Sequence, residues 1–103
     1  MNELPKREEF LLQLNTKFRV FFDGAQATEV ELTEVSELRP RNNFVAFSLV
    51  FTAPKTIYPG QYVSRVEHDK LGAFELLLVP FEENEKGYAF EALFNQLAND
   101  AGD

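Results

Sequence analysis

The segment ATEVELTEVSEL, residues 27–38, carries the pattern that decides the fold. Val30 and Leu32 alternate with glutamates, and this period of two is typical of a strand with one buried and one solvated face. Val35 then falls on the opposite parity. A β-bulge between Leu32 and Val35 would return the apolar side chains to the core and would bend the strand, as a closing barrel requires. The segment therefore predicts a bent, half-buried β-strand.

Segments of similar character follow one another from Lys17 onward. They are rich in Phe, Val, Leu and Tyr and are separated by turn residues. The segment 73–81 is apolar on both faces, which is typical of a central strand or of one whose second face is covered. Pro80 cannot donate to a ladder and is expected at the end or on the edge of its strand. The predicted strands are 17–22, 27–38, 44–52, 61–68, 73–81 and 88–94.

Residues 5–14 have helical periodicity instead, with Phe10, Leu11 and Leu14 on one face. We expect a single domain, residues 1–103, of the all-β class: a small six-stranded antiparallel barrel with a short N-terminal helix that plugs an end or covers a face. A partly open barrel or a two-sheet sandwich accepts the same strands and stays an alternative. Residues 95–103 are small and polar and are expected to fray.

Composition restricts the chemistry. The chain is 45% hydrophobic and 26% charged, has a net charge of −7 and contains no cysteine. Acidity of this kind disfavours nucleic acid and anionic membranes as partners. The absence of cysteine excludes disulfides, thiolate nucleophiles and Cys-type zinc sites. No apolar run has the ~18 residues of a membrane helix, and residues 1–10 lack the apolar core of a signal peptide, so we expect a cytoplasmic protein.

Motifs of known enzymes are missing. The glycines stand singly, so no phosphate-binding loop is present, and there is no G-x-S-x-G elbow. His68 lies between Glu67 and Asp69, but neighbours in a strand point to opposite faces, which favours a structural role over a metal or acid–base site. The acidic loop 82–86 lacks the ligand order of a calcium loop. We expect no catalytic, metal-binding or cofactor-binding residues, and no enzyme.

Residues 39–43, RPRNN, are the one local concentration of cationic and amide groups, and they are predicted to form a loop. Arg39, Arg41 and Asn43 are candidate partner contacts, because guanidinium groups bind carboxylates in a bidentate manner. Tyr58 and His68 are the other candidates. The alternatives are a connection kept soluble by its charges and residues that merely pack.

The stretch H-x-x-L-G-x-F-x-L-x-L-V-P, residues 68–80, and the segment Y-x-x-E-A-x-F-N, residues 88–95, resemble a family of small bacterial proteins known only as a domain of unknown function. The resemblance spans most of the chain. It implies a bacterial source, no established activity and an association with phage-tail-collar-like genes. The chain departs from the family pattern in its lengthened acidic loop and in an inserted phenylalanine in YAFEALFN, which leaves the pairing of the last strand open.

We therefore interpret the chain as a protein interaction or assembly module, for example a phage-tail-associated accessory. It is expected to act through its surface and an exposed strand edge, and to bind a protein partner or a second copy there. A module for a small ligand or a glycan, built on Tyr58, Tyr62 and the proline-fixed loop between residues 53 and 60, is the alternative. Neither the partner nor the oligomeric state follows from the sequence.

Overall fold

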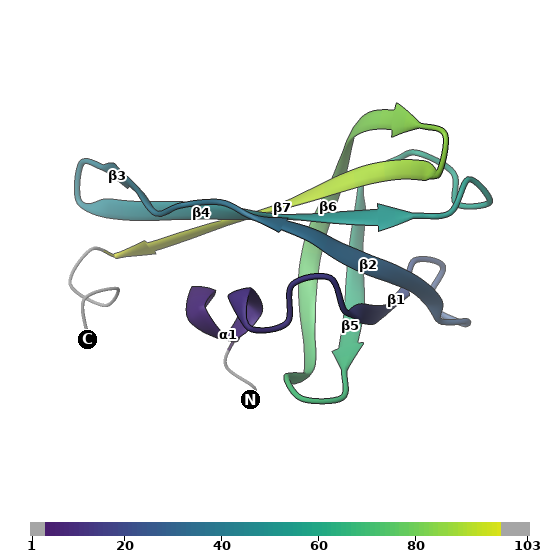
Figure 1. The fold of residues 1–103 in the computed structure, drawn as a ribbon, viewed down its shortest axis with the longest axis horizontal. Helices are drawn as coiled ribbons and strands as arrows, with labels where there is room; N and C mark the ends of the chain where they lie inside the picture. Colours follow the sequence, from purple (N-terminus) through teal and green to yellow (C-terminus); the bar gives the residue numbers. More distant parts are fainter. Residues whose placement is uncertain (1–3, 98–103) are drawn as a thin grey trace.

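The computed structural model describes residues 4–97 of the chain. They form one short helix and a set of antiparallel strands (Figure 1). The elements are α1 (Arg7–Leu11), β1 (Lys17–Phe21), β2 (Thr28–Val35), β3 (Arg39–Arg41), β4 (Phe44–Ala53), β5 (Tyr62–His68), β6 (Gly72–Asn84) and β7 (Gly87–Leu97).

All strands except β3 join a closed barrel. Its neighbours run β1-β2-β4-β7-β6-β5 and back to β1, and every pair is antiparallel. The predicted six-stranded antiparallel barrel is thus confirmed, in its closed form. β3 pairs only with β4, outside the ring. Figure 1 shows β4 and β7 lying across β5 and β6, so that the barrel consists of two crossed layers.

β2 contributes to both layers because it changes partner along its length. Its first half pairs with β1 and its second half with β4, and the β4 register shifts between Leu32 and Glu34. This is the bulge that the parity change before Val35 predicts. The extra residue lets the strand turn the corner while Val30 and Leu32 both stay buried.

β6 turns the opposite corner in the same way. It pairs with β5 over residues 72–78 and with β7 over residues 79–84, with a register shift between Pro80 and Glu82. Pro80 therefore lies inside the strand, and the expectation that it ends the strand or lies on an edge is wrong. A bulge tolerates proline because the ladder is already interrupted there.

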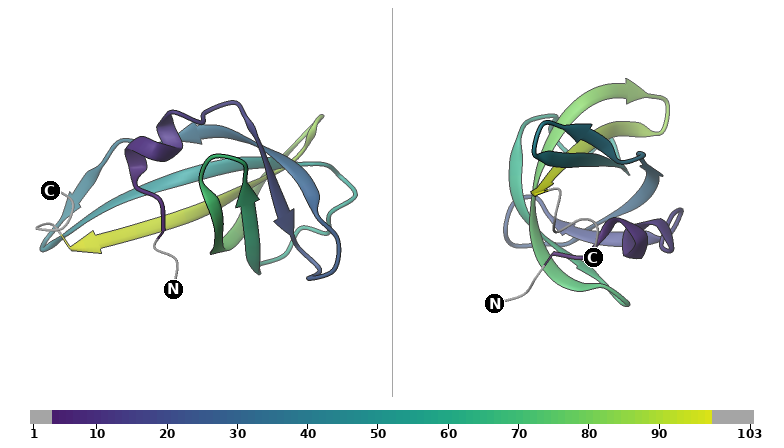
Figure 2. Two further views of the ribbon diagram at one scale, coloured as in Figure 1. Left: turned by 90° about the horizontal axis from the view of Figure 1, so that it is seen from below. Right: turned by 90° about the vertical axis from the view of Figure 1, so that its left-hand side faces the viewer.

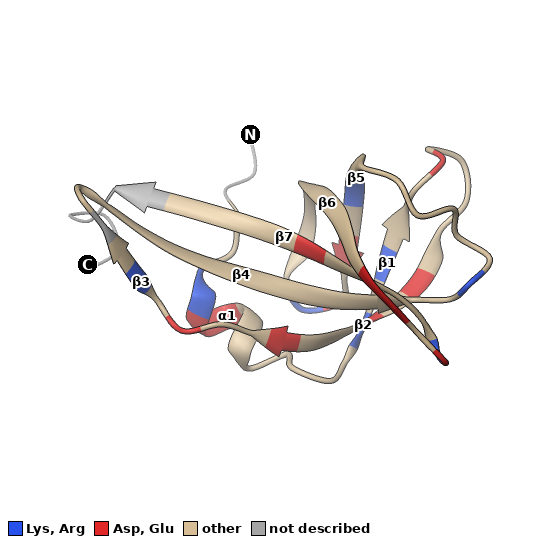
Figure 3. Ribbon diagram, turned by 90° about the horizontal axis from the view of Figure 1, so that it is seen from above, with Lys and Arg blue, Asp and Glu red and all other residues tan. Residues whose placement is uncertain are grey.

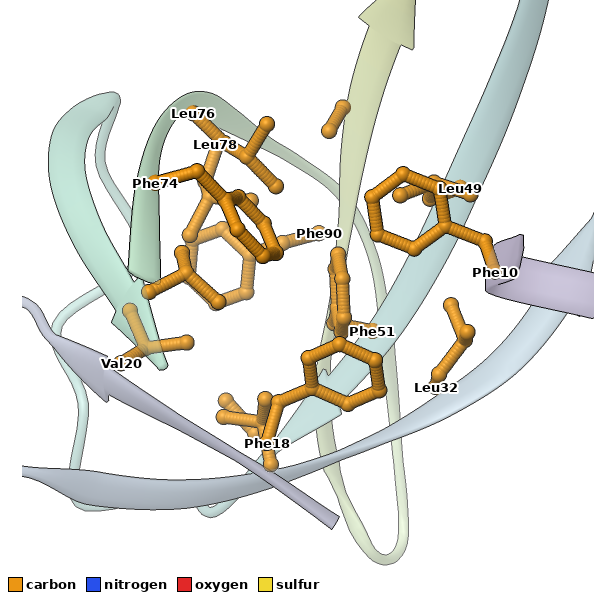
Figure 4. Packing of buried hydrophobic residues seen from close by; sticks show 14 of the residues in the cluster. Phe10, Phe18, Val20, Leu32, Leu49, Phe51, Phe74, Leu76, Leu78 and Phe90 are labelled. Atoms are coloured by element: carbon orange, nitrogen blue, oxygen red, sulfur yellow. The ribbon is translucent and has the colours of Figure 1, made fainter. Parts of the chain in front are cut away.

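The core consists mainly of phenylalanine rings and branched aliphatic side chains from every strand of the barrel. Phe10 points from α1 into this interior (Figure 4) and is fully buried. Its ring centroid lies 6.4 Å from that of Phe18 on β1, 5.7 Å from that of Phe74 on β6 and 5.5 Å from that of Phe94 on β7. One side chain thus fixes the helix against three strands.

The helix is shorter than the predicted 5–14. It begins after Lys6, whose backbone N–H donates to Glu9 Oε1 at 2.8 Å, and its last helical residue is Leu11. Tight turns follow up to Asn15, which takes a left-handed φ of 68°. The helix lies beneath β2 and β4 on the inner side of that layer (Figure 2). It therefore closes the core rather than covering an outer face.

Two predicted loops are partly strand. Residues 39–41 form β3, an edge strand that tolerates Pro40, and Asn42 in the turn to β4 takes a left-handed φ of 58°. The acidic segment 82–86 extends the β6–β7 hairpin, whose turn is held by Asn84 Oδ1 accepting the N–H groups of Lys86 and Gly87. Composition alone predicts loops at both places, because the pairing that makes these short segments strands cannot be read from their own residues.

The last strand also runs further than predicted. β7 continues to Leu97, and Phe44 on β4 pairs with Leu97, so residues 95–97 of the expected frayed tail belong to a regular ladder. The rest of that tail, residues 98–103, lies outside the described residues.

Candidate interaction surfaces

The cationic segment of the sequence forms the β3–β4 hairpin. Arg39 and Asn43 are exposed, and Arg41 lies on β3 opposite Phe44. Figure 1 shows this hairpin at one extreme of the long axis of the molecule, beyond the barrel. Arg39 has no ion-pair partner among the described residues. The hairpin thus offers positive charge at a projecting tip.

Tyr58 lies far from that hairpin, in the loop between β4 and β5 at the opposite extreme of the long axis (Figure 1). Its side chain is 79% exposed, and the loop is fixed by the Tyr62 hydroxyl, which donates to the Tyr58 carbonyl at 2.7 Å. Beside it is a surface hollow of about 350 Å³. The lining residues are Phe22, Asp23, Gln26, Thr28, Thr56, Ile57, Tyr58 and Tyr62.

His68 is buried rather than presented to a partner, since only 6% of it is exposed. Its Nδ1 accepts the Lys70 backbone N–H at 3.0 Å, so the ring proton of the neutral form lies on Nε2. Nε2 lies 3.0 Å from Thr16 Oγ1, which donates in turn to the Gln13 carbonyl at 2.7 Å. The chain of donors and acceptors is complete with a neutral imidazole.

The surroundings of His68 keep it in that neutral form. Burial lowers the pKa of His68 below its ordinary value of 6.5; Asp69 opposes this shift, and Arg19 and Lys70 reinforce it. The centroid of the His68 ring also lies 4.3 Å from that of Phe18, with the two ring planes tilted by 41°. This geometry favours the structural role of His68 over a contact. The candidate residues therefore lie at two opposite ends of the molecule and in its core, and they form no common surface.

No cluster of three His, Asp or Glu side chains suited to a metal ion occurs within residues 4–97. Over the same range, none of the helical structure is long and apolar enough for a membrane span.

Several large apolar side chains are exposed elsewhere, on the outer side of β5, β6 and β7. Val63 and Leu77 are register partners and are 72% and 51% exposed. Leu93 is 56% exposed, and Phe81, beside the β6 bulge, is 54% exposed. We call Val63, Leu77, Phe81 and Leu93 the outer apolar face. Its sequence signal was the apolar character of residues 73–81 on both faces, which does not reveal whether the second face is covered.

Three carboxylates lie around the outer apolar face, and Arg65 of β5, the register partner of Glu75, lies beside them. Glu75 precedes Leu77 by two residues on the same side of β6, and Glu91 precedes Leu93 by two residues on the same side of β7. Glu82 follows Phe81 directly. None of these three carboxylates forms an ion pair with another described residue. Figure 3, which looks onto the outer side of β4 and β7, shows the acidic positions on β7 and at the β6–β7 hairpin.

Fold and surface together define the class: a small closed antiparallel β-barrel with an acid-rimmed apolar patch on its outer wall. The chain matches the family described as Domain of unknown function (DUF6916) over residues 5–94. Because this match covers most of the chain, the protein belongs to that family. No curated protein and no solved structure matches it.

Proposed function

We propose that the protein is an interaction or assembly module that docks a partner protein on its outer apolar face. The observation that carries this proposal is the exposure of Val63, Leu77, Phe81 and Leu93, each of them more than half exposed, on the outer side of β5, β6 and β7, where β6 passes from one layer of the barrel to the other. Scattered exposed apolar residues are normal, whereas neighbouring ones on a rigid sheet are typical of binding surfaces.

The carboxylates around the outer apolar face favour a partner with basic side chains. Glu82 and Glu91 form no ion pair with a described residue, and Glu75 lies opposite Arg65, which forms its ion pair with Glu67 instead. An apolar centre excludes water from a contact, and an acidic rim attracts Lys and Arg around it. The partner therefore presents an apolar patch flanked by basic side chains. A component of a phage-tail-like assembly is the partner that the family resemblance suggests.

The test is a binding measurement with two competing surface variants. The tagged protein is used to isolate partners from the cells that produce it, and each candidate is then purified and titrated against the wild type. Leu77→Glu places a charge in the centre of the outer apolar face and is expected to weaken binding about tenfold or more. Because Leu77 is half exposed, this substitution should leave folding unchanged, which circular dichroism checks.

The matched control changes the other end of the molecule. Arg39→Glu with Arg41→Glu reverses the charge of the β3–β4 hairpin and leaves the outer apolar face intact. Unchanged binding by this control supports the outer face. Loss of binding in the hairpin variant, together with normal binding by Leu77→Glu, would refute the proposal and move the contact to the hairpin.

A second candidate function is favoured by the hollow at Tyr58. An exposed aromatic ring beside Asp23, Gln26 and two threonines supplies the stacking surface and the hydrogen-bonding groups that sugars require. Binding of a glycan that is lost in Tyr58→Ala and kept in Leu77→Glu would support this alternative. A screen of soluble oligosaccharides by NMR of the labelled protein tests it directly.

A further inference from the structure

The hydrogen bonds of β4 fix the direction of the backbone groups of β7. The Ser36 N–H donates to the Ser48 carbonyl at 2.9 Å, and the Ser48 N–H donates to Ser36 Oγ at 2.8 Å, so both backbone groups of Ser48 face β2. Neighbouring residues of a strand alternate in direction, so those of Phe47 and Leu49 face β7. Their partners are Phe94 and Ala92.

The remaining residues of β7 must then face away from β4. The backbone N–H and C=O groups of Leu93 and Asn95 point to the far side of the strand. On that side β7 pairs with β6 only as far as Glu91, opposite Val79. No described residue beyond that point pairs with β7 on this side or makes a backbone hydrogen bond to Leu93 or Asn95. The edge is therefore open within residues 4–97.

This open edge lacks the usual protection. Native sheets keep other chains away from an edge with charged side chains, proline or a bulge. Residues 92–97, ALFNQL, contain no charged residue and no proline, and the ladder with β4 is regular throughout. An unprotected edge of this length is a template for pairing with an extended chain.

The shape around the edge suits one added strand. β6 separates from β7 beyond Val79, and Leu77 and Leu93 lie on the outer side of the two strands as these diverge. On the inner side the ring of Phe10 contacts both Phe74 of β6 and Phe94 of β7. The core is thus sealed at the separation, and the edge can take a strand without opening the barrel.

We propose that the partner binds by adding an extended segment to the edge of β7 at Leu93 and Asn95, antiparallel or parallel to it. Leu77, Leu93, Glu75 and Glu91 all lie on the outer side, so the outward face of the segment, formed by every second residue, carries both apolar residues and Lys or Arg. Its apolar side chains contact Leu77 and Leu93, and its basic side chains reach Glu75 and Glu91. This inference rests on the proposed interaction function and specifies its mode.

Charge argues against a second copy as the occupant. Residues 91–97 contain one glutamate and no cation, so a second β7 offers nothing to Glu75 or Glu91. Each copy also carries a net charge of −7, so that association of two copies brings like charges together. A basic extended segment pairs with the same backbone groups of β7 and also neutralises Glu75 and Glu91.

The test uses a synthetic heptapeptide, VTKTVTK, with a fluorescent label at its N-terminus and an amide C-terminus, in which Val and Lys share one face of an extended strand. Its control, VKTKVTT, has the same composition but places Val and Lys on opposite faces. Binding to the full-length protein is followed by fluorescence anisotropy, and amide hydrogen exchange is measured by NMR. We expect the one-faced peptide to bind at least about tenfold more tightly than the control, and the Leu93 and Asn95 amides to gain protection.

Two variants at Asn95 separate the contribution of its backbone N–H to binding from that of its side chain. Asn95→Pro removes a donor that points to the open edge and leaves the β4 ladder intact, as proline on an edge allows. Asn95→Ala removes the same side chain and keeps the donor. We expect Asn95→Pro to weaken binding about tenfold, and Asn95→Ala to bind within about twofold of the wild type.

The outcomes distinguish strand addition, the proposed binding mode, from docking on the outer apolar face, the proposed function. Equal binding by Asn95→Pro and the wild type, with loss in Leu77→Glu, overturns strand addition and leaves the outer face as the docking site. Insensitivity to both variants overturns both proposals. A concentration-dependent dimer of the wild type that Asn95→Pro abolishes, seen by light scattering, overturns the basic partner in favour of a second copy. The exchange measurement on the wild type decides the question even if Asn95→Pro fails to fold.

Discussion

Replacing Phe10 with alanine is expected to remove much of the stability of the barrel. Phe10 is fully buried and packs on phenylalanine rings from β1, β6 and β7. Truncating a buried Phe costs about 3–5 kcal/mol through lost transfer energy and the cavity left behind. Because α1 has only 5 residues, it has no stability of its own once this anchor is gone. We therefore expect a loss near the middle of that range, about 4 kcal/mol, against the roughly 5–15 kcal/mol that stabilises a domain of this size.

Urea denaturation followed by circular dichroism measures this loss. With a dependence of about 2 kcal/mol per molar urea, the midpoint of Phe10→Ala should fall by roughly 2 M. Leu12→Ala is the matched control, because Leu12 directly follows the helix and is 81% exposed; its stability should change by about 0.5 kcal/mol at most. A loss below about 1.5 kcal/mol for Phe10→Ala would refute the reasoning that one ring joins the helix to three strands.

Three further predictions follow from buried groups. The folded-state pKa of His68 lies below the unfolded value of 6.5, so the unfolded chain binds more protons in the window just below pH 6.5. Stability is therefore fully present above that pH and falls as the pH drops through the window. Urea midpoints should show this dependence, and His68→Leu should flatten it. Ser64 Oγ is buried without a hydrogen-bond partner, so Ser64→Ala should raise stability by about 1 kcal/mol in urea denaturation, and a loss of stability would contradict this. A Cβ at Gly87 would overlap the Ala53 carbonyl oxygen, so Gly87→Ala should cost about 2 kcal/mol or more, measured as a lower thermal midpoint.

The barrel could be predicted because its information is local. Alternating apolar residues place each strand, and the parity change before Val35 places a bulge that the register between Leu32 and Glu34 confirms. β3 could not be predicted, because three residues that include Pro40 carry no periodicity and become a strand only by pairing with β4. The length of the β6–β7 hairpin likewise depends on pairing across the turn rather than on the acidic composition of residues 82–86.

The candidate site was harder to predict because it depends on what covers each face. Residues 73–81 show apolar character on both sides, which fits a covered strand as well as an exposed one. The sequence does not show that α1 packs against the interior through Phe10 and leaves Leu77 in solvent. The role of His68 depends on Thr16, 52 residues away, and no local pattern joins them. Arg39, by contrast, is exposed as its composition suggests.

The central claim is that the outer side of β5, β6 and β7, around the point where β6 and β7 separate, is the docking surface. The most direct measurement is to titrate the ¹⁵N-labelled protein with the VTKTVTK peptide and to map the amide shifts. The account predicts that the largest shifts fall on Val63, Leu77, Leu93 and Asn95. Shifts confined to the β3–β4 hairpin or to the loop at Tyr58, with the docking surface unchanged, would contradict it.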